Sequence, residues 1–165
     1  MAITYEPIAT TTLSTATATV TFSSISGSYT DLVLVISPKN TAGSLVRLQF
    51  NSDTGNNYSR TVLQGNGTSA TSVRSSSQGH IAIGEDAAPS TTLGNTAFIV
   101  QVMNYSNATT YKTILSRENN AGVAVSATVG LWRNTSAITT IDVKQGGAAQ
   151  FDTGSTFSLY GIKSA

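Results

Sequence analysis

Strict alternation of polar and apolar residues is the feature that most constrains the fold of this chain. Between Thr15 and Phe22, a threonine stands at every odd position and an apolar residue at every even position. Successive side chains of a β-strand point to opposite faces, so this pattern predicts a strand with one polar and one buried face. No segment carries a sustained 3.6-residue apolar period, and we therefore expect no amphipathic helix.

The same criterion predicts nine to eleven strands, separated by turns rich in Gly, Ser, Asn and Pro. Besides 15–22, the candidates are 32–36, 45–51, 58–64, 80–83, 96–104, 110–117, 123–132, 138–144 and 156–162. The region 65–79 is compatible with a short hairpin at 69–74 or with a mobile loop. Many short strands without interleaved helices indicate an all-β protein, and we expect one antiparallel β-sandwich domain over residues 1–165, jelly-roll-like.

Length, charge and cysteine content exclude several classes of protein. A chain of 165 residues is long enough to bury one core, and the absence of cysteine excludes disulfides and thiolate chemistry. Nine basic and eight acidic residues leave a net charge of +1, and the basic residues are scattered rather than clustered as in nucleic-acid binders. We therefore expect no nucleic-acid partner. We also expect no membrane span and no signal peptide, because no long apolar run occurs.

The polar residues are mainly Ser, Thr, Gly and Asn, and only 10% of the chain is charged. Short hydroxyl side chains lose less conformational entropy than long charged ones, and less desolvation energy, when a contact buries them. This composition is typical of a protein that works inside an assembly.

Candidate catalytic residues are few, and we expect neither an enzyme nor a cofactor. His80 is the single histidine, which excludes a site of several histidines, and no Gly-x-Ser-x-Gly motif is present. We expect His80 to be an ordinary polar position at a strand start. Glu85 and Asp86 form the one adjacent carboxylate pair, but neighbours in an extended chain point to opposite faces.

The turn at 51–57 is rich in side-chain oxygens, contributed by Asn51, Asp53, Thr54 and Asn56. Calcium prefers several hard oxygen ligands, so this turn is a candidate calcium site. A single carboxylate is a weak basis for binding a divalent ion, and Asx-turn hydrogen bonding accounts for the same residues. We favour the structural turn and keep calcium as the alternative.

Exposed aromatic rings can bind sugars by stacking. Trp132, Tyr58 and Tyr105 are the candidate glycan contacts, with Tyr111 and Tyr160 as further aromatic positions. For Trp132 we favour packing in the core over glycan contact, because tryptophan buries a large apolar area.

Several segments, in order, resemble a group of small structural proteins of tailed bacteriophages, many from aquatic hosts. They are 22–35, 48–58 (LQFNSDTGNNY), 111–117 (YKTILSR), 130–133 (GLWR) followed by 137–141 (AITTI), and 154–163 (GSTFSLYGIK). The resemblance implies a β-sandwich on the outer surface of a phage particle. It carries over no catalytic or metal-binding residue.

Within that resemblance, the first hypothesis is a capsid decoration or cement protein that docks on the major capsid protein lattice as a homotrimer. Residues 1–14 are a candidate extended arm that adds a strand to a neighbour through Ile3, Tyr5 and Ile8, although an ordinary first strand explains them equally well. The alternative hypothesis is a tail or fibre module that binds host-surface glycan. A glycan-degrading enzyme ranks last, since no convincing carboxylate pair is present.

Overall fold

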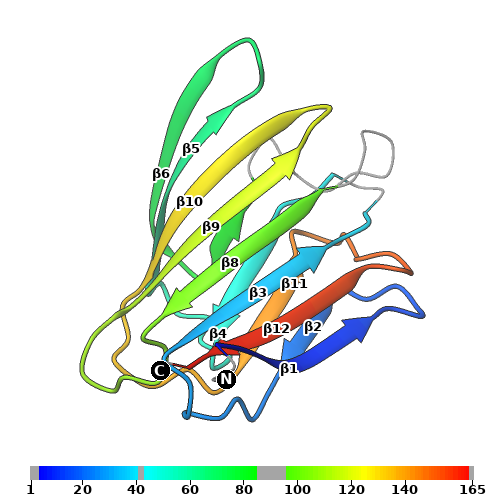
Figure 1. Cartoon of the computed structure of the whole chain (residues 1–165). Helices are drawn as coiled ribbons and strands as arrows, with labels where there is room; N and C mark the ends of the chain where they lie inside the picture. Colours follow the sequence, from blue (N-terminus) through cyan, green and yellow to red (C-terminus); the bar gives the residue numbers. More distant parts are fainter. Residues whose placement is uncertain (1–3, 41–42, 85–95, 164–165) are drawn as a thin grey trace.

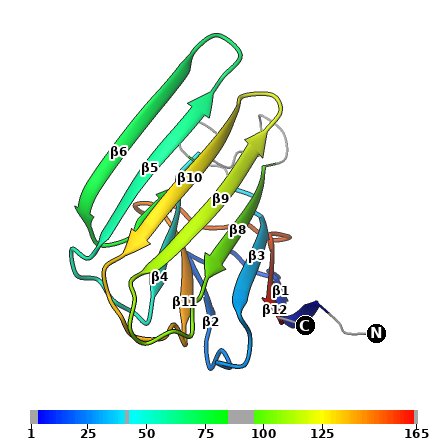
Figure 2. The same ribbon diagram turned by 60° about the vertical axis from the view of Figure 1, so that its left-hand side comes forward.

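A computed structural model describes residues 4–40, 43–84 and 96–163, and the chain forms an antiparallel β-sandwich (Figures 1 and 2). The larger sheet has eight strands in the order β1 (Tyr5–Thr12), β12 (Thr156–Ile162), β3 (Asp31–Ser37), β8 (Ala97–Met103), β9 (Lys112–Asn120), β10 (Ala124–Trp132), β5 (Tyr58–Gly65) and β6 (Ala70–Gln78). The smaller sheet has the order β2 (Thr19–Phe22), β11 (Ile141–Gln145), β4 (Val46–Phe50) and β7 (Ile81–Ile83). Within these ranges no helix is long and apolar enough to cross a membrane.

The connections between strands confirm the predicted antiparallel sandwich. From β2 to β5 the chain changes sheet at every step, and it does so again from β6 to β8 and from β10 to β12. Repeated crossing of the chain between two sheets is typical of jelly-roll topologies. The β5–β6 hairpin and the β8–β9–β10 meander stay within the larger sheet and widen it beyond the smaller one.

Most predicted strands occur, with differences at their ends. The strand predicted over 15–22 begins only at Thr19, because Thr17 forms an isolated bridge with Phe151 rather than a continuous ladder. In the region 65–79, residues 70–78 form one long strand, β6, that pairs with β5, so neither the short hairpin at 69–74 nor the mobile loop is observed. Strand β9 continues to Asn120, three residues beyond its predicted end, because it pairs with β10 along its whole length.

The core lies between the two sheets and is closely packed. Phe50, Tyr58 and Trp132 are fully buried, and the Tyr58 and Trp132 rings stack with their centroids 6.2 Å apart. Gly130 marks a close approach between the sheets, since a Cβ atom there would lie 2.8 Å from side-chain atoms of both Ile114 and Ile81. A side chain larger than hydrogen at this position would therefore push the sheets apart.

The smaller sheet covers only part of one face of the larger sheet. In Figures 1 and 2 the β5–β6 hairpin and the neighbouring ends of β9 and β10 extend well past β4 and β11. The opposite face of the eight-stranded sheet has no second layer among the described residues (Figure 2). This uncovered face is called the outer face below.

Candidate interaction surface

The outer face begins with the alternation of side chains along β10. Ala124, Ser126 and Trp132 point into the sandwich and are buried. The intervening Val125 and Val129 point outward and are 59% and 56% exposed. The outward face of this strand is therefore apolar, whereas the solvated face of an antiparallel sheet is normally polar.

Strand register lines up the outward side chains of neighbouring strands into continuous rows. One row, read from β6 to β1, contains Ser72, Leu63, Ala127, Arg117, Ile99, Val35, Ser158 and Thr10. The next row contains Arg74, Thr61, Val129, Leu115, Gln101, Val33, Tyr160 and Pro7. These residues come from distant parts of the chain and meet only because of the strand order.

Exposed large apolar side chains gather on this face. Leu63 is 64% exposed, Met103 41%, Ile99 37% and Val35 36%, in addition to the two β10 valines. Soluble monomers rarely expose large contiguous apolar patches, and such patches usually mark a contact with another macromolecule. We therefore take the outer face as the candidate interaction surface.

A shallow hollow of about 470 Å³ lies on this face between β10 and the β5–β6 hairpin. Its lining includes the apolar Leu63, Ala70, Val125 and Ala127 together with Arg117. Among the residues of the two rows, the charged side chains are Arg117 and Arg74. The hollow and its surroundings are thus apolar with a positive border, which complements an apolar surface bordered by carboxylates.

The predicted glycan contacts Trp132, Tyr58 and Tyr105 are wrong, because each side chain is 0% exposed and offers no ring face to a sugar. Their polar atoms bind inside the protein instead: Trp132 Nε1 donates to Asp53 Oδ2 at 2.7 Å, and the Tyr58 hydroxyl donates to the Asp53 carbonyl oxygen at 3.0 Å. The core packing favoured for Trp132 is confirmed. Tyr111, in contrast, is 55% exposed.

Hydrogen bonds explain the oxygen-rich turn at 51–57. Asp53 accepts from the backbone N–H of Gly55 at 2.8 Å and from Asn57 Nδ2 at 2.9 Å, in addition to Trp132. Burial opposes ionisation of Asp53, but these three hydrogen bonds outweigh it and hold the pKa of the carboxyl below its ordinary value. Both carboxylate oxygens thus face N–H donors, an arrangement that fits the structural turn rather than the calcium alternative. The described ranges contain no cluster of acidic or histidine side chains suited to a metal ion.

The N-terminal segment is a strand of the larger sheet. Strand β1 pairs with β12 from Tyr5 to Thr12, and Ile8 packs against the core. The free-arm interpretation is therefore wrong for Tyr5 and Ile8, and the ordinary first strand is observed; Ile3 lies outside the described residues. Tyr5 is 54% exposed and stays a predicted contact.

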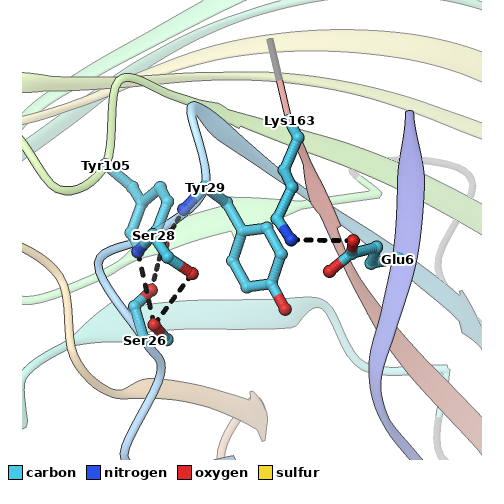
Figure 3. A network of polar contacts seen from close by, with 6 residues as sticks. All are labelled: Glu6, Ser26, Ser28, Tyr29, Tyr105 and Lys163. Carbon is cyan, nitrogen blue, oxygen red and sulfur yellow. Dashed lines mark hydrogen bonds and ion pairs between the residues drawn. The ribbon is translucent and has the colours of Figure 1, made fainter. Parts of the chain in front are cut away.

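Polar contacts at the end of β12 hold β1 in place (Figure 3). Lys163 Nζ donates to Glu6 Oε1 at 2.8 Å and lies 5.6 Å from the centre of the Tyr29 ring. The Tyr105 hydroxyl donates to the Ser26 carbonyl oxygen, and the backbone N–H of Tyr29 donates to that hydroxyl at 3.4 Å (Figure 3). This network fixes the 26–29 turn beneath the β1–β12 pair.

His80 lies just before β7 and is half-buried. Burial lowers its pKa, and the positive charges of Arg47 and Arg60 lower it further. The side chain is therefore neutral at pH 7. Glu85 and Asp86, the other candidates for chemistry, lie outside the described residues.

Two buried titratable side chains in β9 were not expected from the sequence. The Glu118 carboxylate accepts hydrogen bonds from the hydroxyls of Ser116 and Ser126, the latter at 2.7 Å, and burial raises its pKa despite these bonds. Lys112 Nζ donates to the carbonyl oxygens of Thr110 at 2.6 Å and Thr135 at 2.9 Å. These contacts join loops and strands. A charged residue at an inward position of an alternating strand is the sequence feature that could have predicted such buried groups.

No protein-family model and no curated protein matches this chain.

Proposed function

We propose that this chain is a structural protein of a tailed-phage virion, a capsid decoration or cement protein that docks on the major capsid protein lattice through the outer face. The uncovered apolar outer face of the eight-stranded sheet is the observation that carries the proposal. A contact surface of this kind needs neither a catalytic group nor a cofactor. The resemblance of the sequence to small phage structural proteins supplies the setting.

The proposed mechanism is burial of apolar area, repeated over many copies. Covering Leu63, Val125 and Val129 removes exposed apolar surface from water at about 25 cal/mol per Å². A standard interface buries on the order of 1,600 Å² in total, which a rigid sheet face can supply without ordering a flexible segment. Each docked copy that touches two capsid subunits holds those subunits together, and the effect accumulates over the lattice.

Charge narrows the chemistry of the partner. Arg117 lines the apolar hollow and Arg74 lies in the next row of the same face, so the complementary capsid surface carries apolar side chains flanked by carboxylates. Rim charges of this kind mainly affect the association rate, and we expect docking to slow as the salt concentration rises.

Purified protein added to emptied heads of its phage tests the proposal. We expect hundreds of bound copies per head and heads that withstand a higher temperature than undecorated ones. A few copies confined to the tail, or no binding to heads, would contradict a decoration role.

The tail or fibre module that binds glycan is the second candidate. The three aromatic residues predicted to contact glycan are buried in the core, and Tyr111 is the exposed ring that could still serve this role. Binding of the isolated protein to a glycan array, abolished by Tyr111→Ala, would favour it over the decoration role.

A further inference from the structure

Strand β6 is an open edge of the larger sheet. It has nine residues, is the last strand in the sheet order, and pairs only with β5 among the described residues. In both views it is the outermost strand of the β5–β6 hairpin, and no other element lies beyond it (Figures 1 and 2). An edge strand presents backbone N–H and C=O groups that can pair with another strand.

The other three edges are shortened or interrupted. Strands β2 and β7 have four and three residues, and β1 contains Pro7 and a register shift between Pro7 and Ala9. Short edge strands, prolines and bulges are the usual means by which proteins block unwanted strand pairing. Strand β6 contains no proline and pairs regularly with β5 from Ala70 to Ser75. Its one register shift lies beyond Ser75, so among the edges of the described sheets the segment 70–75 of β6 is the one best suited to pairing.

We propose that a second copy of this chain pairs with β6 through its own β6, antiparallel, about a two-fold axis perpendicular to the sheet at Val73. Such a contact is self-complementary, because each copy contributes the same strand. An axis at Arg74 would place two guanidinium groups opposite each other, which is unfavourable. An axis at Val73 instead places Arg74 opposite Ser72 of the second copy and brings the two Val73 side chains together.

The dimer deepens the proposed function and rests on it. A two-fold axis perpendicular to the sheet leaves the outer faces of both copies on the same side. The apolar hollows, each lined by Leu63 and Ala70 close to the seam, then form one surface that can dock on a single capsid. The arrangement is a dimer and replaces the homotrimer that the resemblance implies.

The pairing is weak when the protein is free in solution. A contact confined to one strand per copy falls below the roughly 1,200 Å² that stable complexes bury. Docking of both copies on one particle makes the second contact intramolecular and strengthens the pairing. Free protein is therefore expected as a monomer that dimerises reversibly on concentration.

Sedimentation equilibrium of the full chain, without capsid, tests the pairing. Ser72 is exposed on the outer face, so Ser72→Glu should tighten the dimer through two pairs with Arg74, by roughly 2- to 30-fold, and Ser72→Lys should weaken it comparably. Thr12→Lys, on the opposite edge strand, is the control and should change nothing. Absence of dimer at every concentration, a trimer mass, or equal effects of Ser72→Glu and Ser72→Lys would overturn the proposal.

A single-cysteine experiment tests the position of the axis, since the natural chain contains no cysteine. Val73→Cys should give a disulfide-linked dimer on a non-reducing gel, whereas Thr71→Cys, two residues from the axis, should not. Equal crosslinking of the two variants would contradict the axis. Val73 pairs with the buried Val62, so circular dichroism should first show that the Val73→Cys protein is folded. If that variant does not fold, the Ser72 variants test the dimer instead. Loss of dimer with normal docking on heads would reject this inference alone.

Discussion

Phe98, Ile99 and Val100 are consecutive on β8, yet Phe98 and Val100 are 0% exposed and Ile99 is 37% exposed. The same contrast recurs on β10, where Trp132 is buried and Val129 is 56% exposed. The inner face of the eight-stranded sheet buries its apolar side chains in the core. The outer face leaves apolar side chains of similar size exposed to water. The difference leads us to propose that the inner face provides stability and the outer face provides association. Substitutions on the inner face should therefore affect unfolding, and substitutions on the outer face should affect binding.

The largest expected effect compares two residues of β10. Trp132→Ala should lower the free energy of unfolding by about 3–5 kcal/mol, because it leaves a cavity among Phe50 and Tyr58. Val129→Ala should change it by less than about 0.5 kcal/mol, since the side chain is exposed. Urea unfolding measures both free energies, with far-UV circular dichroism as the signal because it does not depend on the tryptophan. Equal losses would break the distinction between the two faces.

A smaller effect comes from adding volume rather than removing it. Gly130→Ala should destabilise the protein by about 1–3 kcal/mol, because the new Cβ would lie 2.8 Å from Ile114 and Ile81. Ala127→Val, which points to the outer face of the same strand, should be close to neutral. Thermal unfolding of the two variants sharpens the comparison, and a stable Gly130→Ala protein would show that the sheets are less tightly packed than described.

The buried Glu118 adds a pH dependence to the inner face. Burial raises its pKa, so the folded protein retains the proton to higher pH than the unfolded chain. The free energy of unfolding should therefore fall as the pH rises from the ordinary carboxyl range through the raised pKa. Glu118→Gln should remove this fall and be more stable than wild type at neutral pH, by about 1 kcal/mol. Urea unfolding at several pH values measures it; parallel profiles for both proteins would disprove the assignment.

The smallest expected effect concerns the turn that supports Trp132. Both Asp53 oxygens accept N–H donors, so millimolar calcium should shift the melting temperature by less than about 1 °C, and a chelator should do the same. Differential scanning calorimetry with and without calcium tests this. A rise of several degrees would restore the calcium alternative and show that the turn rearranges on binding.

Much of the fold could be predicted because a period of two is a local property of the sequence. Strand β12 has the predicted bounds, 156–162, since its buried and half-buried residues alternate without interruption. The buried position of Trp132 could be predicted from its size alone. That of Tyr58 could not, because the alternation along β5 does not say which face is inside. Strand β1 was equally ambiguous: an edge strand buries few residues, so only its pairing with β12 distinguishes it from a free arm.

The candidate surface was beyond prediction for a different reason. Its rows join Leu63 of β5, Ala127 of β10 and Ile99 of β8, which neighbour one another only in the sheet order β8-β9-β10-β5. Strand order depends on long-range packing, which a local pattern does not contain. The sequence could indicate an assembly protein from its composition, but not which face would make the contact.

Occupancy of emptied heads by an outer-face variant tests the central claim most directly. Leu63→Glu combined with Val129→Glu places two carboxylates on the apolar rows and should lower occupancy at least tenfold, corresponding to about 1.4 kcal/mol or more. Ala148→Glu, on an exposed turn at the end of β11, is the matched control and should bind as the wild type does. Wild-type occupancy by the double variant, with its fold intact, would contradict the assignment of the outer face as the docking surface.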